Sequence, residues 1–586
     1  MLSFFVSPAA LFAQTTYNIM PLGNSVTRGI TGSTIGGYRG TLQNLLETSG
    51  YTIGPGNDID FVGSQTDPDT PSSSIPDVDH EGHSGYTTLD IISGISTWLT
   101  DNPPDMVLLH IGTNDLEAPR TPSDIANSLN TILGDIDTQD PNIIVVLARI
   151  ILDDNDNQGV NGTKATITKE YNSDLINTAV ERIINNDDKL IVVNMQDALI
   201  YPDSLTTLPA PGNRVGSTDI FYSLSSSLLH PYQTGYDKMA NVWSNAILGY
   251  FNDTPLLINP LSASANQSVP VTLAWGITQN AVSYLVQIAT DASFGMLIYN
   301  VGDGTITSRY LILDNSDPNV DLNKGGFKSS TTYYWRVRPL DGGNSTIGSY
   351  SDAWSFTTSP LYVDATVLLE GAYDDGTHLM RTDLNTTPIQ TLPLNDPYGK
   401  GESVGSIPSP DIVDWVLVQL RTATEEGNPE TATVVEAERA AFLKKDGTIV
   451  DLDGTSPVSF TGISFGDYYI VVEHRNHLAV MSNTPVTLSD YTLTYDFTTA
   501  QNKAYTTGPN PMADLGDGNF GMFTGDGNAN GSITASDNNS VWLPQFLAGE
   551  DGYKSGDYNL NGSVTASDNN SAWLINFLLG ADSQVP

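Results

Sequence analysis

A serine near the N-terminus and a histidine far downstream have the chemistry of an acyl-transfer site. Ser25 lies in IMPLGNSVTRG, directly after an apolar run that predicts a strand, and His230 lies in LLHPYQTGYDKMA, just before a predicted helix. A serine hydroxyl is a weak nucleophile until an imidazole accepts its proton, and its attack on an ester creates an oxyanion that needs fixed donors. We therefore predict a hydrolase with Ser25 as nucleophile and His230 as base.

These two residues need a scaffold that brings distant segments together. From Tyr17 to about Phe251, apolar runs such as TYNIMPLG, DMVLLHIG and NIIVVLARI alternate with amphipathic stretches of helical length. Strands followed by such helices predict a parallel sheet covered on both faces, which is a three-layer α/β domain. Ser25 is then placed at the carboxyl edge of the sheet, where open α/β folds build their sites.

Four short motifs give this domain a family resemblance. Ser25, Gly85 in HEGHSGYT, Asn114 in LLHIGTND and His230 follow in the order Ser, Gly, Asn, His. The domain resembles the SGNH (GDSL-type) hydrolases, whose parallel sheet is flavodoxin-like, and DHEGHSGYT, PDMVLLHIGTND and EYN bring it close to carbohydrate esterase family 3, the acetylxylan esterase type. The resemblance implies an acetylated polysaccharide as substrate. It also implies an oxyanion hole made by the backbone N–H groups of Ser25 and Gly85 and the side-chain amide of Asn114.

Two positions depart from the family pattern. Asn24 stands where the family usually has Asp before the serine, and Ser227 stands where it usually has Asp three residues before the histidine. Three alternatives follow: a Ser25–His230 dyad whose imidazole is oriented by a backbone carbonyl, orientation by another acid such as Asp219, or loss of most activity. The rival function is a non-catalytic structural or adhesive surface protein that reuses the fold. A carbohydrate-binding protein is a third hypothesis.

The C-terminal segment contains a duplicated loop, because GDGNANGSITASDNNSVWLPQFLAG recurs as GDYNLNGSVTASDNNSAWLINFLLG. Oxygen-bearing side chains stand at positions 1, 3, 5, 9 and 12 of each loop, with glycine at position 6, which is the spacing of an EF-hand-like calcium loop. The predicted ligands are Asp526, Asn528, Asn530, Thr534 and Asp537 with the carbonyl of Ser532, and Asp557, Asn559, Asn561, Thr565 and Asp568 with the carbonyl of Ser563.

Paired loops of this kind, each followed by a predicted helix, resemble a dockerin. The resemblance implies Ca²⁺ as a bound ion and a cohesin-like or cell-surface partner. Position 5 is Asn rather than the Asp often found in that family, which leaves two carboxylates per loop and predicts weaker affinity. The alternative is a pair of turn-rich repeats that bind no metal.

Changes in pattern along the chain predict a multidomain protein. We expect a signal-peptide-like segment at residues 1–13, the hydrolase domain at 14–253, a β-sandwich resembling fibronectin type III at 254–360, a β-rich module of unknown role at 361–506, and the α-helical repeat at 520–582. The apolar first segment ends in small residues, although it lacks the usual basic residue before them. We therefore expect a secreted protein.

The excess of acidic residues limits the classes of molecule that the protein is expected to bind. The sequence has 24 Lys and Arg against 67 Asp and Glu, a formal charge of -43, which disfavours binding to nucleic acid or to an anionic membrane surface. No later apolar stretch is long enough to span a bilayer. Without Cys, any metal must be held by oxygen or imidazole. His474 and His477 are predicted on one strand, where side chains three residues apart point to opposite faces, so we do not expect them to share a metal.

Overall fold

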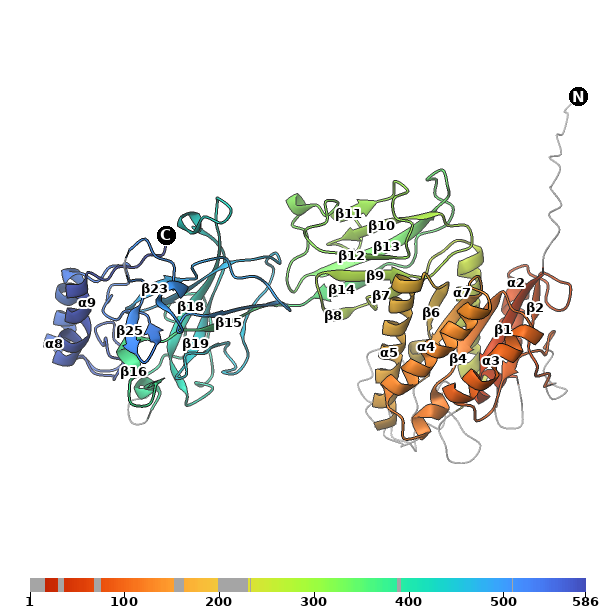
Figure 1. Cartoon of the computed structure of the whole chain (residues 1–586), viewed down its shortest axis with the longest axis horizontal. Coiled ribbons are helices and arrows are strands. Elements are labelled where there is room, and N and C mark those ends of the chain that lie inside the picture. The colour runs from red at the N-terminus through yellow and green to blue at the C-terminus, as the bar shows by residue number, and fades with distance from the viewer. Residues whose placement is uncertain are drawn as a thin grey trace, which may run out of the picture. The chain divides into compact units, whose positions relative to one another are not determined.

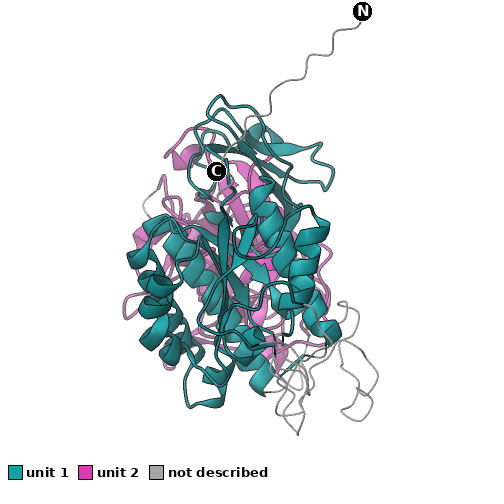
Figure 2. Cartoon of the chain, turned by 90° about the vertical axis from the view of Figure 1, so that its right-hand side faces the viewer, with its two compact units in different colours: residues 1–264, 270–324, 333–356 teal, residues 265–269, 325–332, 357–586 magenta. Residues whose placement is uncertain are grey.

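A computed structural model describes residues 16–29, 36–67, 75–151, 163–198, 230–231, 233–386, 391–508 and 510–586. The chain divides into two compact units, the first comprising residues 1–264, 270–324 and 333–356 and the second residues 265–269, 325–332 and 357–586 (Figure 2). The predicted N-terminal segment 1–13 lies outside the described residues. In the described part of the chain, no helix combines the length and the apolar character needed to cross a membrane.

The first unit is organised around a parallel sheet (Figure 1). Its strands are β1 (Tyr17–Gly23), β2 (Ile59–Phe61), β3 (Glu81–Gly82), β4 (Met106–His110), β5 (Ile144–Arg149) and β6 (Leu190–Asn194). The main order is β2-β1-β4-β5-β6, and β3 pairs with the end of β1. This is the strand order of flavodoxin-like folds, in which the chain reverses direction beside the first strand. The predicted α/β fold is confirmed.

Helices cover both faces of this sheet. The long helices are α2 (Arg39–Thr48), α3 (Thr88–Asp101), α4 (Pro122–Gln139), α5 (Thr163–Asn186) and α7 (Gln233–Phe251), and the short ones are α1 (Ser25–Arg28), α6 (Met195–Ala198) and a 3-10 turn (Thr113–Glu117). Two apolar clusters follow, one between the sheet and α3, α4 and α5, the other between the sheet and α2 and α7. Thr87 and Thr121 begin α3 and α4 with capping boxes closed by Asp90 and Asp124, which satisfy otherwise unpaired N–H groups.

A β-sandwich continues from this domain. Its strands are β7 (Leu257–Asn259), β8 (Ser264–Gln267), β9 (Val271–Trp275), β10 (Ser283–Ala289), β11 (Leu297–Val301), β12 (Tyr310–Leu313), β13 (Thr332–Leu340) and β14 (Trp354–Thr358). They form a sheet in the order β11-β10-β13-β14-β8 and a smaller one in the order β12-β9-β7. Ile258 and Ala274 belong to the same apolar cluster as α3 to α5, so the smaller sheet packs on the α/β domain. The likeness to fibronectin type III stays a prediction.

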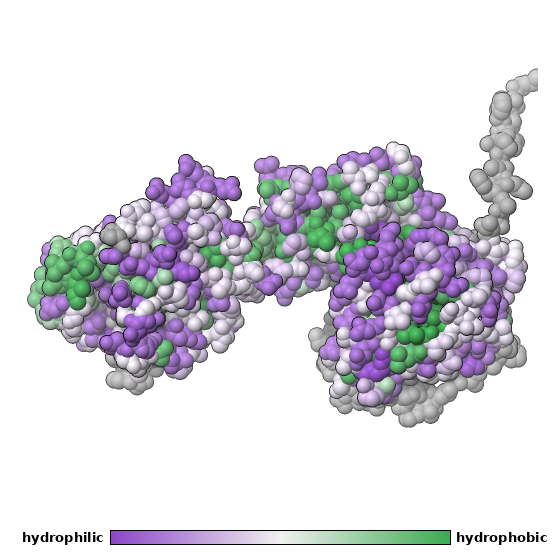
Figure 3. All heavy atoms as spheres, in the orientation of Figure 1, coloured by the Kyte–Doolittle hydropathy of each residue, from purple (hydrophilic) through white to green (hydrophobic). Residues whose placement is uncertain are grey.

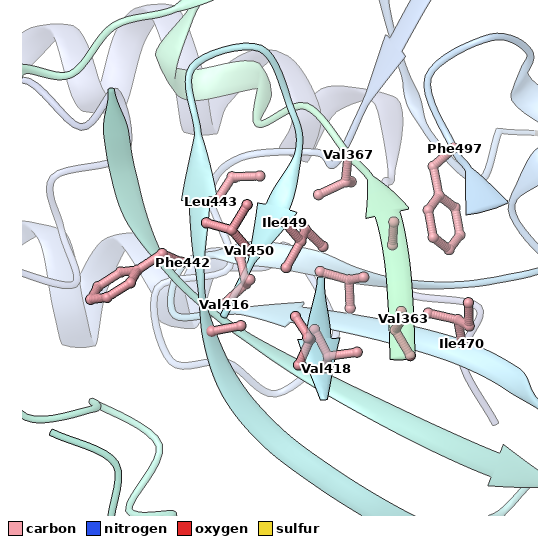
Figure 4. Packing of buried hydrophobic residues seen from close by; sticks show 14 of the residues in the cluster. Val363, Val367, Val416, Val418, Phe442, Leu443, Ile449, Val450, Ile470 and Phe497 are labelled. Carbon is pink, nitrogen blue, oxygen red and sulfur yellow. The ribbon is translucent and has the colours of Figure 1, made fainter. Parts of the chain in front are cut away.

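The second unit contains another sandwich. Its strands are β15 (Leu361–Thr366), β16 (Tyr373–Asp374), β17 (Leu379–Met380), β18 (Ile412–Thr422), β19 (Val434–Lys444), β20 (Ile449–Val450), β21 (Val458–Phe460), β22 (Tyr469–His474), β23 (His477–Met481), β24 (Thr492–Asp496), β25 (Ala513–Gly516) and β26 (Asn519–Gly521). The sheets β20-β19-β18-β22-β23 and β21-β15-β24 enclose the core. Figure 4 shows Val363 of β15 close to Val418 and Ile470 of the other sheet.

Short 3-10 turns interrupt the β-rich regions at Leu322–Lys324, Glu370–Ala372, Asp383–Asn385, Pro429–Thr431 and Gln501–Lys503.

The expectation that His474 and His477 lie on one strand is wrong. His474 ends β22 and His477 begins β23, and their Nδ1 atoms lie 3.0 Å apart. The chain turns at Arg475 and Asn476, so the alternation of a single strand does not apply. Their remaining ring nitrogens face Asp414 and the backbone N–H of Gly371.

The duplicated segment packs against this sandwich. After each loop the chain forms a π-helical turn and a short helix, Asp537–Trp542 with α8 (Leu543–Ala548) and Asp568–Trp573 with α9 (Leu574–Leu579). Trp542, Trp573 and Tyr558 share an apolar cluster with Leu478 and Phe523 of the sandwich. The repeat and the sandwich therefore have a common core within the second unit.

Candidate active site

Ser25 lies in a tight turn at the carboxyl end of β1. Asn24 caps the short helix α1, since its Oδ1 accepts a hydrogen bond from the backbone N–H of Val26 at 3.0 Å. Gly23 has no room for a side chain, because a Cβ atom there would lie 2.2 Å from the carbonyl oxygen of His110. The close approach of β1 and β4 thus requires glycine, and the turn presents Ser25 as the first residue of α1.

His230 meets Ser25 across more than two hundred residues of sequence. Its Nε2 lies 2.8 Å from Ser25 Oγ. Burial lowers the pKa of the imidazole below its ordinary value of 6.5, so the ring is neutral at pH 7, and in the tautomer protonated at Nδ1 its Nε2 can accept a hydrogen bond from Ser25 Oγ. Within the described residues His230 Nδ1 has no hydrogen-bond partner. Ser227 and Asp219 lie outside the described residues, so the three alternatives for the orienting group stay open.

Two further loops leave the same edge of the sheet. Gly23 is paired with Gly82 on one side and with His110 on the other, so the chain segments after β1, β3 and β4 start side by side. The backbone N–H of His83 donates to the carbonyl oxygen of Gly23 at 2.9 Å, which ties the loop containing Gly85 to the serine turn.

Gly85 and Asn114, the predicted oxyanion donors, are linked through one residue. Gly85 is exposed and has a φ of +83°, a conformation that favours glycine. Asn114 lies in the 3-10 turn after β4, and its Nδ2 donates to the carbonyl oxygen of Tyr86 at 2.8 Å. This bond uses one amide hydrogen and leaves the second for a ligand. The oxyanion assignment itself stays a prediction.

Buried carboxylates that the sequence interpretation missed hold these loops. Asp115 accepts hydrogen bonds from the backbone N–H and the hydroxyl of Thr88, at 2.9 and 2.6 Å, and is contacted by Arg120. It therefore joins the loop after β4 to the start of α3. The available signal was its position in GTND, where an acidic residue directly follows Asn114.

Glu81 has a similar function beside the Gly85 loop. It is fully buried and accepts from Ser64 N at 2.6 Å and from Ser64 Oγ at 2.8 Å, while His83 Nε2 lies 2.6 Å from its Oε1. The ring of His83 stacks against both Tyr86 and Trp98, with ring centroids 4.6 Å from each, and those two rings lie 6.4 Å from one another. HEGHSGYT thus forms a hydrogen-bonded and stacked wall that fixes the loop after β3.

The two C-terminal loops have the same geometry. In the first, Asp526 accepts from the backbone N–H groups of Asn530 and Gly531 at 3.0 and 2.9 Å, and Asp537 accepts from those of Asn528 and Thr534 at 3.2 and 2.8 Å. In the second, Asp557 and Asp568 repeat these contacts with Asn561, Gly562, Asn559 and Thr565. All four carboxylates are buried. Each loop therefore gathers two buried carboxylates and further side-chain oxygens, a donor set that fits a hard cation such as Ca²⁺.

Comparisons with known proteins identify the N-terminal domain. The sequence profile of the GDSL-like lipase/acylhydrolase family matches residues 22–238, which therefore form a domain of this family. A curated relative, a multidomain esterase of Ruminococcus flavefaciens, is 27% identical over 285 residues, which cover 45% of this chain and 33% of that protein. The chain thus spans about a third of this relative.

Similar solved structures include two carbohydrate esterases of family 3. The one from Clostridium thermocellum is 32% identical, covers 40% of this chain and 96% of its own, and has a TM-score of 0.31. The one from Talaromyces cellulolyticus is 23% identical, with the same coverage and TM-score.

Proposed function

We propose that the N-terminal domain hydrolyses acyl esters through Ser25 and His230. The observation that carries the proposal is the 2.8 Å approach of His230 Nε2 to Ser25 Oγ at the carboxyl edge of the sheet. Ser25 Oγ attacks the ester carbonyl carbon while His230 Nε2 takes the hydroxyl proton. The imidazolium then gives that proton to the departing alcohol oxygen, which leaves an acyl-serine. Water, activated by the same imidazole, attacks the acyl group and restores Ser25.

The oxyanion of each tetrahedral intermediate is stabilised by the N–H groups of Ser25 and Gly85 and by the second amide hydrogen of Asn114. Asn114 is held for this purpose, because its other amide hydrogen is bonded to Tyr86 O. Donors fixed before the reaction stabilise the developing charge without paying for reorganisation. Loss of one such donor costs about 3 kcal/mol of transition-state stabilisation in related hydrolases.

The proposed substrate is an acetylated polysaccharide. The support is the sequence resemblance of DHEGHSGYT and PDMVLLHIGTND to carbohydrate esterase family 3, together with the Ruminococcus flavefaciens relative described as a multidomain esterase. Export through the apolar N-terminal segment belongs to the same proposal, because that segment ends in small residues as a signal peptide does.

The test measures hydrolysis of p-nitrophenyl acetate and acetate release from acetylated xylan. Wild type should hydrolyse both, and Ser25→Ala should lose both activities with an unchanged melting temperature. Ser93→Ala on the exposed side of α3 is the matched control and should retain wild-type rates. Equal turnover by Ser25→Ala would place the activity elsewhere. An inactive wild type would favour the structural or adhesive alternative.

For the C-terminal repeat we propose two bound Ca²⁺ ions and a docking function. Asp526 and Asp537 would hold the first ion and Asp557 and Asp568 the second, with the Asn, Thr and Ser oxygens of each loop completing the coordination. The following helices expose apolar side chains instead of burying them. Leu547, Leu578 and Leu579 are 74%, 74% and 62% exposed. Figure 3 shows an apolar patch over α8 and α9.

An exposed apolar face of this kind marks a protein-binding surface. We therefore propose a cohesin-like partner that covers α8 and α9. Leu547→Asp with Leu578→Asp should abolish capture of the full chain by an immobilised cohesin while leaving ester hydrolysis unchanged. Unchanged capture by this double variant would exclude the face as the binding surface.

A further inference from the structure

A cavity of about 230 Å³ lies in the first unit, at the edge of the parallel sheet away from β2. Residues of strand β6, helix α7 and strands β7 and β14 line it. Figure 1 shows these elements in the first unit. Most of its lining is aliphatic, and Trp354 contributes an aromatic ring. The polar side chains in the lining are those of Arg149, Asn194 and Asn245, and none of the described lining residues is acidic.

Arg149 is the unusual member of this lining. It ends β5 and is only 8% exposed, and its Nε has no hydrogen-bond partner. Its ion pair is loose, because Nη1 lies 3.9 Å from Asp197 Oδ2. The Asp197 side chain is 62% exposed and already accepts a hydrogen bond from Asn194 Nδ2. Burial lowers the pKa of Arg149, but a guanidinium keeps its charge near neutral pH.

Another buried arginine of the same domain shows how a structural guanidinium is satisfied. Arg182 on α5 is also 8% exposed, but its Nε is hydrogen-bonded to the buried carboxylate of Asp188. Its Nη1 donates to Asn130 Oδ1 at 2.9 Å. Buried donors are nearly always paired, and acidic residues greatly outnumber basic ones in this chain. Arg149 lines the cavity with a guanidinium that is less completely paired than that of Arg182, which points to an acceptor that enters the cavity and pairs with this guanidinium.

We propose that this cavity binds an aliphatic monocarboxylate whose carboxylate pairs with Arg149 and whose chain lies against the apolar wall. A guanidinium recognises a carboxylate through parallel N–H bonds. The neighbouring Asp197 side chain is 62% exposed, so solvent screens its charge from a carboxylate in the cavity. An apolar cavity of about 150 Å³ admits benzene, so about 230 Å³ holds roughly nine non-hydrogen atoms. This size corresponds to a chain of about six to eight carbons with its carboxylate.

The site is separate from the proposed esterase centre. Neither Ser25, His230, Gly85 nor Asn114 lines the cavity. Strand β6 is three strands from β1, which is roughly 14 Å at the spacing of neighbouring strands. The proposal therefore stands whether or not the domain hydrolyses esters.

The experiment is calorimetric titration of the full chain with sodium octanoate. Titration with octan-1-ol tests whether the carboxylate is needed for binding. Titration with sodium acetate tests whether the alkyl chain is needed. We expect one saturable octanoate site per chain and no detectable acetate binding. Arg149→Gln should weaken octanoate binding about tenfold or more, because a charge-assisted hydrogen bond is lost, while affinity for octan-1-ol stays the same. Lys189→Gln removes one positive charge outside the lining and is the matched control.

A second variant tests the apolar part without touching the charge. Val242→Phe on α7 fills the cavity and should abolish binding of both octanoate and octan-1-ol. If Arg149→Gln fails to fold, Val242→Phe still tests the proposal. Esterase activity should be unchanged in both variants. The proposal is overturned if wild type does not bind octanoate, or if both variants bind it like wild type. It is also overturned if Arg149→Gln folds and binds octanoate normally.

Discussion

The Ser25 site and the C-terminal loops are built in opposite ways. Ser25 and His230 come from the two ends of the α/β domain, and they meet because β1 and α7 pack into the same apolar cluster on one face of the sheet. Each C-terminal loop takes its carboxylates from one continuous segment, such as Asp526 to Asp537. The first site depends on the whole domain, whereas each loop is specified locally.

Because the two sites are assembled differently, substitutions in them should have different effects. At a site assembled from distant segments, a single side chain can remove the chemistry and leave the fold unchanged. If the C-terminal loops bind Ca²⁺ as proposed, loss of the ion is loss of folding free energy, because the carboxylates of each loop are then buried without a cation. Substitutions at the first site should therefore change rates, and substitutions in the loops should change stability.

The largest effect is expected at the imidazole. His230→Ala should lower kcat for p-nitrophenyl acetate by at least about a thousandfold, since Ser25 then has no base. The melting temperature should stay within error of wild type. His378→Ala, a half-exposed histidine in the second unit, is the control and should have no effect on kcat. Turnover retained by His230→Ala would refute the dyad and with it the long-range assembly of the site.

Loss of the side-chain oxyanion donor should come next. Asn114→Ala should lower kcat by about a hundredfold to a thousandfold with little change in KM, because the amide is needed only when charge develops. Asn127→Ala on the exposed side of α4 is the matched control. A rise in KM at unchanged kcat would assign Asn114 to substrate binding instead.

The sequence predicts some parts of the Ser25 site and of the C-terminal loops better than others. The residues proposed as loop ligands and the Ser25–His230 pair stand out by residue type and spacing, and alternating strands and helices predict the sheet that joins the pair. The residues that hold the loops of the site were not predictable. Glu81 and Asp115 act through hydrogen bonds to Ser64 and Thr88, and only the fold brings these partners near. The residues lining the Arg149 cavity come from separate strands and a helix, so no local pattern marks them.

Calcium removal tests the local construction. With free Ca²⁺ at a hundred times Kd, each site adds about 2.7 kcal/mol to the free energy of unfolding. EDTA should therefore lower the melting transition of the second unit and leave that of the first unit unchanged. Asp526→Asn with Asp537→Asn should abolish one bound ion per chain in a calcium titration. Identical melting in calcium and in EDTA would show that the repeats are turn-rich connectors.

A smaller effect is expected from pH. Burial lowers the pKa of His230 below 6.5, and only the neutral imidazole accepts the proton of Ser25. The ratio kcat/KM should be level at neutral pH and fall about tenfold per unit once the pH drops below the depressed pKa. Measurement of kcat/KM between about pH 4 and 8, with the rate of Ser25→Ala subtracted as background, gives the pH at which activity falls on the acidic side. An acidic limb centred above 6.5 would indicate a nearby carboxylate that raises the pKa.

The smallest effect separates the two loops from each other. The second loop is held by the sandwich, because Asn476 Nδ2 donates to the carbonyl oxygen of Asp557 at 2.8 Å and to that of Ser555 at 3.2 Å. The first loop is held by the C-terminal residues, through Ser583 N and Gly531 O at 2.7 Å, and it meets Asn476 only at the backbone, where Gly525 N donates to Asn476 O at 3.0 Å. A scaffold that fixes the backbone before the ion arrives reduces the ordering cost of binding.

Asn476→Ala should therefore weaken calcium binding a few-fold in the second loop and leave the first unchanged. It should also cost the second unit about 1 to 3 kcal/mol, since buried carbonyl groups lose their donor. Titration of Asn476→Ala combined with Asp526→Asn and Asp537→Asn isolates the second site, and Asp557→Asn with Asp568→Asn isolates the first. Equal weakening of both sites would mean that the two loops bind as one unit. The contrast between local and long-range construction would then not extend to the individual loops.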